Sequence, residues 1–162
     1  MYENKRKPNR LNNYDYSKNG AYFITICLKD RNKLLWKTLN SEIIYSDGIV
    51  LSETGKWVDF AINNIAIHYP MISVTKYVIM PDHIHMILVV NRDYDQIGTT
   101  PTISTVINQM KGFVTKKIGF SMWQKLFYDR IIRNDAEYEH IWNYIDKNPE
   151  NYRTDDLYEN PF

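Results

Sequence analysis

The sequence has few of the features that would place it outside the cell or in a membrane. Cys27 is the single cysteine among 162 residues, which excludes an internal disulfide. No apolar run reaches the roughly 18 residues that a membrane-spanning helix needs, and residues 1–16 lack the apolar core of a signal peptide. We therefore expect a globular cytoplasmic protein with no membrane partner.

The net charge of +1 is too small to indicate a nucleic-acid-binding protein, but the basic residues are unevenly distributed. They gather near the N-terminus and again between residues 107 and 133, whereas acidic residues dominate from residue 134 onward. Charge runs are most often solvated faces, although a basic strip can also follow a phosphate backbone. On the second interpretation, the candidate DNA contacts are Lys5, Arg6, Lys7, Arg10, Lys111, Lys116 and Lys117.

The order of the predicted elements indicates an α+β fold. Strands are predicted over 21–29, 73–80, 83–90 and 123–133, and helices over 53–69, 102–119 and 136–148. Residues 34–50 are ambiguous between a short strand and a loop. A βαββαβ order predicts a ferredoxin-like sandwich with an antiparallel sheet, to which a C-terminal helix is added. We expect one domain over 1–162, with a basic arm at 1–19 and a polar tail at 150–162.

Several residues mark where the helices should begin and end. Ser52 is a candidate N-cap, and Pro70 should stop the helix that follows it. Thr100 precedes Pro101, which suits the first position of a helix. Asn134 with Glu137 forms a capping-box pattern. Pro149 should end the last helix.

The stretch YVIMPDHIHMILVV places two histidines inside an otherwise apolar segment. Alternate residues of a strand share a face, so His83 and His85 should point the same way. Neutral imidazole is a common metal ligand, and two unpartnered buried rings would be costly. The alternative is a pair of hydrogen-bonded core residues. No second Cys or His pair completes a zinc site, and a third ligand with an oxygen donor would suit Mg²⁺ or Mn²⁺.

The last predicted helix carries a second set of polar residues. His140, Tyr144 and Asn148 follow one another at intervals of four, which stacks them along one helix face. A tyrosine on a helix usually serves only packing, and this chain has 13 tyrosines. Tyr144 differs by its line of polar neighbours.

The motifs MPDHIHMILVV and LFYDRIIRNDAEYEHIWNYIDKNP together resemble the single-tyrosine HUH transposases of the IS200-like family, most closely the REP-associated tyrosine transposases. The resemblance covers about 21–149. It implies that His83 and His85 hold a divalent metal, Mg²⁺ or Mn²⁺, that Asn148 is the third ligand, and that Tyr144 is the nucleophile. His140 matches a polar position before the tyrosine in some relatives and is a further catalytic candidate. Asp82 stands where the family usually has Asn.

The resemblance implies an endonuclease and strand transferase that acts on single-stranded or hairpin DNA through a 5′-phosphotyrosine, associated with the nucleoid. Three alternatives stay open: a replication-initiator or relaxase-like nuclease, a DNA-binding regulator without cleavage activity, and a metal-binding ferredoxin-like protein with no nucleic-acid partner. The sequence does not decide whether the protein is a monomer or a homodimer.

Overall fold

The computed structural model describes residues 20–39, 42–43, 48–91 and 101–154. The predicted basic arm, Thr100 and the end of the polar tail lie outside these ranges. No helix in the described part of the chain is long and apolar enough to cross a membrane.

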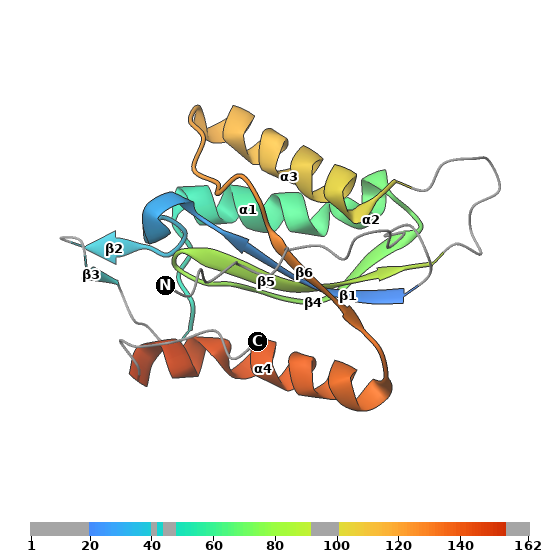
Figure 1. Cartoon of the computed structure of the whole chain (residues 1–162). Coiled ribbons are helices and arrows are strands. Elements are labelled where there is room, and N and C mark those ends of the chain that lie inside the picture. The colour runs from blue at the N-terminus through green and yellow to red at the C-terminus, as the bar shows by residue number, and fades with distance from the viewer. Residues whose placement is uncertain (1–19, 40–41, 44–47, 92–100, 155–162) are drawn as a thin grey trace, which may run out of the picture.

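A four-stranded antiparallel sheet forms the centre of the protein (Figure 1). Its strands are β1 (Gly20–Cys27), β4 (Ile72–Ile79), β5 (His83–Val90) and β6 (Tyr128–Ile132). They lie in the order β4-β5-β1-β6, so the two strands that are central in space are the first and third of the four in sequence. The short pair β2 (Thr38–Leu39) and β3 (Glu42–Ile43) forms a separate sheet from the segment that the sequence left ambiguous.

Helices cover both faces of this sheet. They are α1 (Glu53–Asn63), α2 (Ile65–His68), α3 (Ile103–Ile118) and α4 (Asp135–Thr154), and a short 3-10 turn, η1 (Lys29–Arg31), follows β1. Figure 1 shows α1, α2 and α3 on one side and α4 on the other. The predicted ferredoxin-like α+β architecture with an added C-terminal helix is confirmed.

Alternation along the strands gives the sheet two apolar cores. On β1, Tyr22 and Ile24 face α1 and α3, whereas Phe23 faces α4. The α4 side is closed by Ile141 and Ile145, both fully buried. Because α4 carries the residues of the second predicted motif, this smaller core decides where they lie.

Side-chain bonds also fasten α4 to the edge strand β4. The Tyr138 hydroxyl donates to Thr75 Oγ1 at 2.8 Å, and Lys76 forms an ion pair with Asp146. The register of β4 shifts between Val74 and Lys76, an irregularity of the kind that discourages further strands from adding to an edge.

The predicted caps are largely confirmed. Ser52 Oγ accepts the Gly55 N–H at 3.0 Å and begins α1, and Asn134 Oδ1 accepts the Glu137 N–H at 2.9 Å. The return bond of the second cap differs from a standard capping box, because Glu137 Oε2 accepts the N–H of Arg133 rather than that of Asn134. Glu137 also pairs with Arg130, which fixes the start of α4 to the end of β6.

The interior of one helix and the start of the next differ from the prediction. The helix capped by Ser52 begins at Glu53, as its cap predicts, but it divides at Asn64, because the Asn63 and Asn64 amides donate to the carbonyls four residues earlier and compete with the backbone. The next helix does not open at Pro101. Thr102 is its N-cap, since its hydroxyl accepts the Thr105 N–H.

The ends of the last strand and last helix also differ from the prediction. Of the stretch 123–133, only Tyr128–Ile132 is a strand, and Trp123 forms an isolated bridge with Leu28. Helix α4 continues through Pro149 to Thr154, so 150–154 is not part of a tail. Proline costs the helix one hydrogen bond, but the extra turn brings Tyr152 against Trp36, with ring centroids 5.8 Å apart.

Gly55 is expected to be essential where α1 meets the loop before β2. A Cβ built on Gly55 would lie 2.1 Å from the Leu35 carbonyl oxygen, which already accepts the Ser52 N–H. Gly55→Ala should therefore lower the free energy of unfolding by about 1–3 kcal/mol. Urea unfolding checks this, with Gly112→Ala as the matched control, because a Cβ at Gly112 in α3 meets nothing within 4 Å and should stabilise by about 0.5–1 kcal/mol.

Candidate active site

His83 and His85 open strand β5 on the face that α4 covers. Both are buried, with 2% and 1% of their surfaces exposed. Their ring centroids are 4.7 Å apart, and Phe23 from β1 stacks on His85 at 5.3 Å. The prediction that both imidazoles project from one face of the strand is confirmed.

Each histidine uses its Nδ1 atom for a hydrogen bond within the protein. His83 Nδ1 lies 2.6 Å from Asp82 Oδ1, and His85 Nδ1 lies 2.8 Å from the Thr25 hydroxyl. Metal-ligating histidines usually have such a partner on the second nitrogen, which orients the ring. This pattern fits two metal ligands that bind through Nε2.

The surroundings of His85 favour the neutral form of its ring. Burial lowers the pKa of His85 well below its ordinary value, and the nearby His83 and Arg31 side chains lower it further. A neutral imidazole has the free lone pair that a metal ligand needs.

Asp82 connects the histidine pair to the turn after β1. Its carboxylate accepts from Arg31 Nε at 2.8 Å on the other oxygen. Burial raises the pKa of Asp82, but the hydrogen bond with His83 and the charge of Arg31 outweigh burial and hold the pKa below its ordinary value. Sequence reasoning missed the contacts of Asp82, Arg31 and Thr25. Adjacency to His83 was a signal for Asp82 alone, because the other two reach the site through tertiary structure.

Helix α4 brings Tyr144 to the histidine pair. The Tyr144 hydroxyl lies 3.4 Å from His85 Nε2, and the two ring centroids are 5.3 Å apart. Asn148, one turn later on α4, is completely buried. His140, one turn earlier, is exposed. The structure thus brings His83, His85 and Tyr144 together, places Asn148 inside on the same helix, and leaves His140 at the surface.

The donor set suits an oxygen-preferring divalent metal better than zinc. Over the ranges that the structure describes, no group of three His, Cys, Asp or Glu side chains is placed to hold a metal. Two imidazoles from β5 and an amide from α4 would be a mixed nitrogen and oxygen set, which leaves positions for water or phosphate. The chemistry of these donors is therefore compatible with the divalent metal that the resemblance implied, and the metal itself stays a prediction.

The three candidate DNA contacts that the structure describes do not form one surface. Lys111 in α3 is buried, its Nζ donating to the Gln124 carbonyl at 2.9 Å, so the prediction that it lies at the surface is wrong. Burial follows from its place on the helix face that packs on the segment before β6. Lys116 and Lys117 are exposed at the end of α3, on the layer opposite α4. Lys5, Arg6, Lys7 and Arg10 lie outside the described residues.

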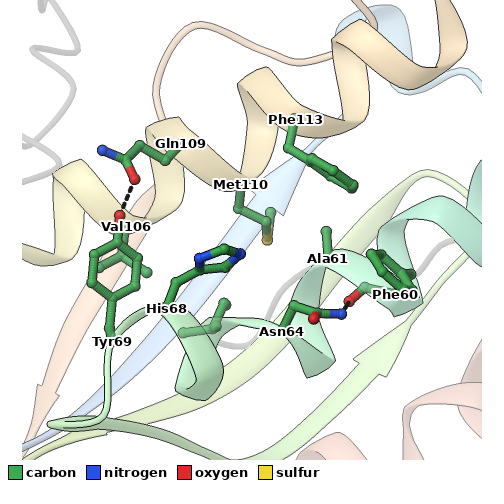
Figure 2. Close-up of a pocket in the computed structure, with 10 residues that line it drawn as sticks. Phe60, Ala61, Asn64, His68, Tyr69, Val106, Gln109, Met110 and Phe113 are labelled. Atoms are coloured by element: carbon green, nitrogen blue, oxygen red, sulfur yellow. Dashed lines mark hydrogen bonds between the residues drawn. The ribbon is translucent and has the colours of Figure 1, made fainter.

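A separate cavity of about 180 Å³ lies between α1, α2 and α3. Figure 2 shows its lining, in which Phe60 and Phe113 come from facing helices and Tyr69 donates a hydrogen bond to Gln109. The sheet separates this cavity from the histidine pair, so it takes no part in the site on the α4 side.

Two proteins of one bacterium are similar to this chain over most of its length. No family model matches it. An "Uncharacterized protein" of Haemophilus influenzae is 30% identical over an alignment of 173 positions. The alignment covers 94% of this chain and 93% of that protein. A "Putative REP-associated tyrosine transposase" of the same organism is 26% identical over 150 residues, covering 86% and 76%.

Among solved structures, a REP-associated tyrosine transposase bound to a REP hairpin superposes with a TM-score of 0.63. The match is 24% identical in sequence and covers 94% of this chain and 74% of that one. At this identity the likeness establishes a shared fold.

Proposed function

We infer that this chain cleaves and rejoins single-stranded or hairpin DNA with Tyr144 as nucleophile. The chain belongs to the IS200-like family of REP-associated tyrosine transposases. The relatives support a transposase-like role in DNA processing. The metal, the nucleophile and the DNA structure recognised are our proposal.

One observation carries this proposal: the hydroxyl of Tyr144 lies 3.4 Å from Nε2 of His85. A phenol from a separate helix therefore stands beside one member of a buried histidine pair whose Nδ1 atoms already have partners. A tyrosine nuclease needs its phenol beside the residues that would hold the metal and, through the metal, the scissile phosphate.

The proposed residues divide the chemistry between them. His83, His85 and Asn148 would hold Mg²⁺ or Mn²⁺, which supplies positive charge for the scissile phosphate. The Tyr144 hydroxyl gives its proton to water, and its oxygen attacks phosphorus. The new bond joins this oxygen to the 5′-phosphate, the bond from phosphorus to the 3′-oxygen breaks, and that oxygen takes up a proton to become a 3′-OH. A second 3′-OH can reverse the step and join strands, because the phosphotyrosine retains the bond energy.

Electrostatic contacts outside the site would hold the DNA. Lys116 and Lys117 remain candidates at the surface, together with Lys5, Arg6, Lys7 and Arg10 in the arm. Phosphate contacts of this kind make affinity fall as salt rises. A single-stranded or hairpin substrate is proposed because a regular duplex would hold the scissile phosphate away from a site set on a sheet.

The test is an adduct assay on the full chain with a labelled library of single-stranded palindromes and Mg²⁺ or Mn²⁺. A protein-linked DNA band on a denaturing gel that requires metal supports the proposal. Tight, salt-dependent hairpin binding with no adduct under any metal would instead support the regulator without cleavage activity, and the absence of both would leave only the shared fold.

His140 serves as a separate test of the catalytic set. If it assists Tyr144, His140→Ala should slow adduct formation by roughly 10- to 100-fold while the adduct still forms, as expected for a general acid or base. Single-turnover cleavage with the hairpin that the library selects measures this rate. A rate equal to that of wild type would remove His140 from the catalytic residues and leave the role of Tyr144 unchanged.

A further inference from the structure

The turn after β1 has an unusual backbone. Asp30 and Arg31 both have φ of 53°, in the left-handed region that residues with a side chain rarely adopt. Two such residues in succession are strained, and strain of this kind persists where the surrounding structure requires it, often beside a functional site. Here the turn brings the Arg31 side chain to the turn between β4 and β5.

Arg31 begins a chain of contacts that ends at His83. Its Nε donates to Asp82 Oδ2 at 2.8 Å, and its Nη1 donates to the Cys27 sulfur at 3.2 Å. The other oxygen of Asp82 lies 2.6 Å from His83 Nδ1. The Asp82 side chain is only 8% exposed and that of Arg31 is 50% exposed, so a guanidinium at the surface compensates the charge of a buried carboxylate.

This chain determines which nitrogen of His83 carries the proton. An ionised carboxylate can only accept hydrogen bonds, so His83 Nδ1 must be the donor, and in the neutral ring the lone pair then lies on Nε2. His85 has no such constraint, because the Thr25 hydroxyl beside its Nδ1 can donate or accept. The two histidines of the pair are therefore oriented by different means.

We propose that Arg31 and Asp82 are positioning residues that hold His83 as the Nδ1–H tautomer and so present its Nε2 lone pair to the divalent metal. The second half of this statement rests on the proposed function, which makes His83 a ligand, but the first half does not. If the pair only tied two turns together, its loss would change stability and leave the tautomer of His83 as it is.

The first measurement uses the full chain without metal or DNA, labelled with ¹⁵N-histidine, and records the ring nitrogen shifts of His83 by NMR. Wild type should show a protonated Nδ1 and an unprotonated Nε2. Asp82→Ala should shift the population toward the Nε2–H form, and Arg31→Met should shift it in the same direction by a smaller amount. Glu53→Gln is the matched control, because it removes the exposed Glu53–Lys56 pair far from the histidines and should change nothing.

The second measurement titrates Mn²⁺ into the same proteins by calorimetry. Loss of the partner that orients a ligating histidine typically costs about 10- to 100-fold in metal affinity, and we expect that range for Asp82→Ala. Asp82→Asn, which keeps an acceptor oxygen, should fall between Asp82→Ala and wild type, and it replaces Asp82→Ala if that variant does not fold.

Unchanged His83 shifts and unchanged Mn²⁺ affinity in a folded Asp82 variant would overturn the proposal, whatever its melting temperature. A wild-type chain that forms no DNA adduct, but whose His83 tautomer still follows Asp82, would overturn the proposed function and keep the positioning role of the pair. An adduct-forming wild type with an indifferent tautomer would do the reverse.

Discussion

Tyr144→Phe is expected to abolish the covalent protein–DNA adduct and to lower the cleavage rate by more than about 10⁴-fold, as loss of a nucleophile commonly does. The substitution removes one oxygen. It keeps the ring that packs edge-on against Phe23, with centroids 6.1 Å apart. Hairpin affinity and melting temperature should therefore stay close to those of wild type. Adduct yield on a denaturing gel and cleavage of labelled hairpin measure the effect.

Tyr138→Phe is the matched control for this prediction. Tyr138 lies on the same helix and its hydroxyl also has a partner, Thr75 Oγ1 at 2.8 Å, but it is not beside the histidines. Loss of that bond should lower stability by about 0.5–1.5 kcal/mol and leave the adduct in place. Persistence of the adduct in Tyr144→Phe, or its disappearance in folded Tyr138→Phe, would assign the nucleophile elsewhere.

His85→Ala is expected to lower cleavage by about 10³-fold or more, because it removes the proposed metal ligand nearest the proposed nucleophile and with it the stabilisation that a metal gives to transition-state charge. A chelator in excess should have the same effect on wild type. Added Mn²⁺ should then restore wild type but not the variant. Cleavage rate and Mn²⁺ affinity by calorimetry provide the two measurements.

The control here is His68→Ala. His68 is exposed at the end of α2, on the opposite side of the sheet from α4, and its loss should change neither cleavage nor Mn²⁺ affinity. His85→Ala will also lose some stability, because the buried ring leaves a space beside Phe23. The comparison is therefore made at a temperature where both variants are folded. Full cleavage by chelated wild-type protein would rule out the metal.

Local pattern was sufficient to predict the shared direction of the histidines. A period of two fixes the face of His83 and His85 once they lie on a strand, and the strand was predicted with its observed bounds, His83–Val90. The four-residue interval likewise placed Tyr144 and Asn148 on one side of a helix. These relations depend only on the geometry of one element.

Relations between elements were not predictable in this way. Thr25 faces His85 because of the register between β1 and β5, which no short stretch of sequence specifies. Arg31 reaches Asp82 because the backbone of Asp30 and Arg31 is in the left-handed region. Neither residue is a glycine, so the sequence does not mark this turn. Helix α4 passes Pro149 because Tyr152 packs on Trp36 from a distant loop, and Lys111 is buried because a carbonyl outside its helix accepts from it. In each case tertiary contacts outweighed the local preference.

The division of the site between a strand and a helix has a consequence for how the activity can be altered. His83 and His85 belong to the central sheet, whereas Tyr144 and Asn148 belong to α4, which is attached through an apolar interface that includes Ile141 and Ile145. On the proposed function, the effective concentration of Tyr144 at the histidines depends on how firmly α4 packs on the sheet. Substitutions in that apolar interface should then change the rate of strand cleavage, even where no reacting group is touched.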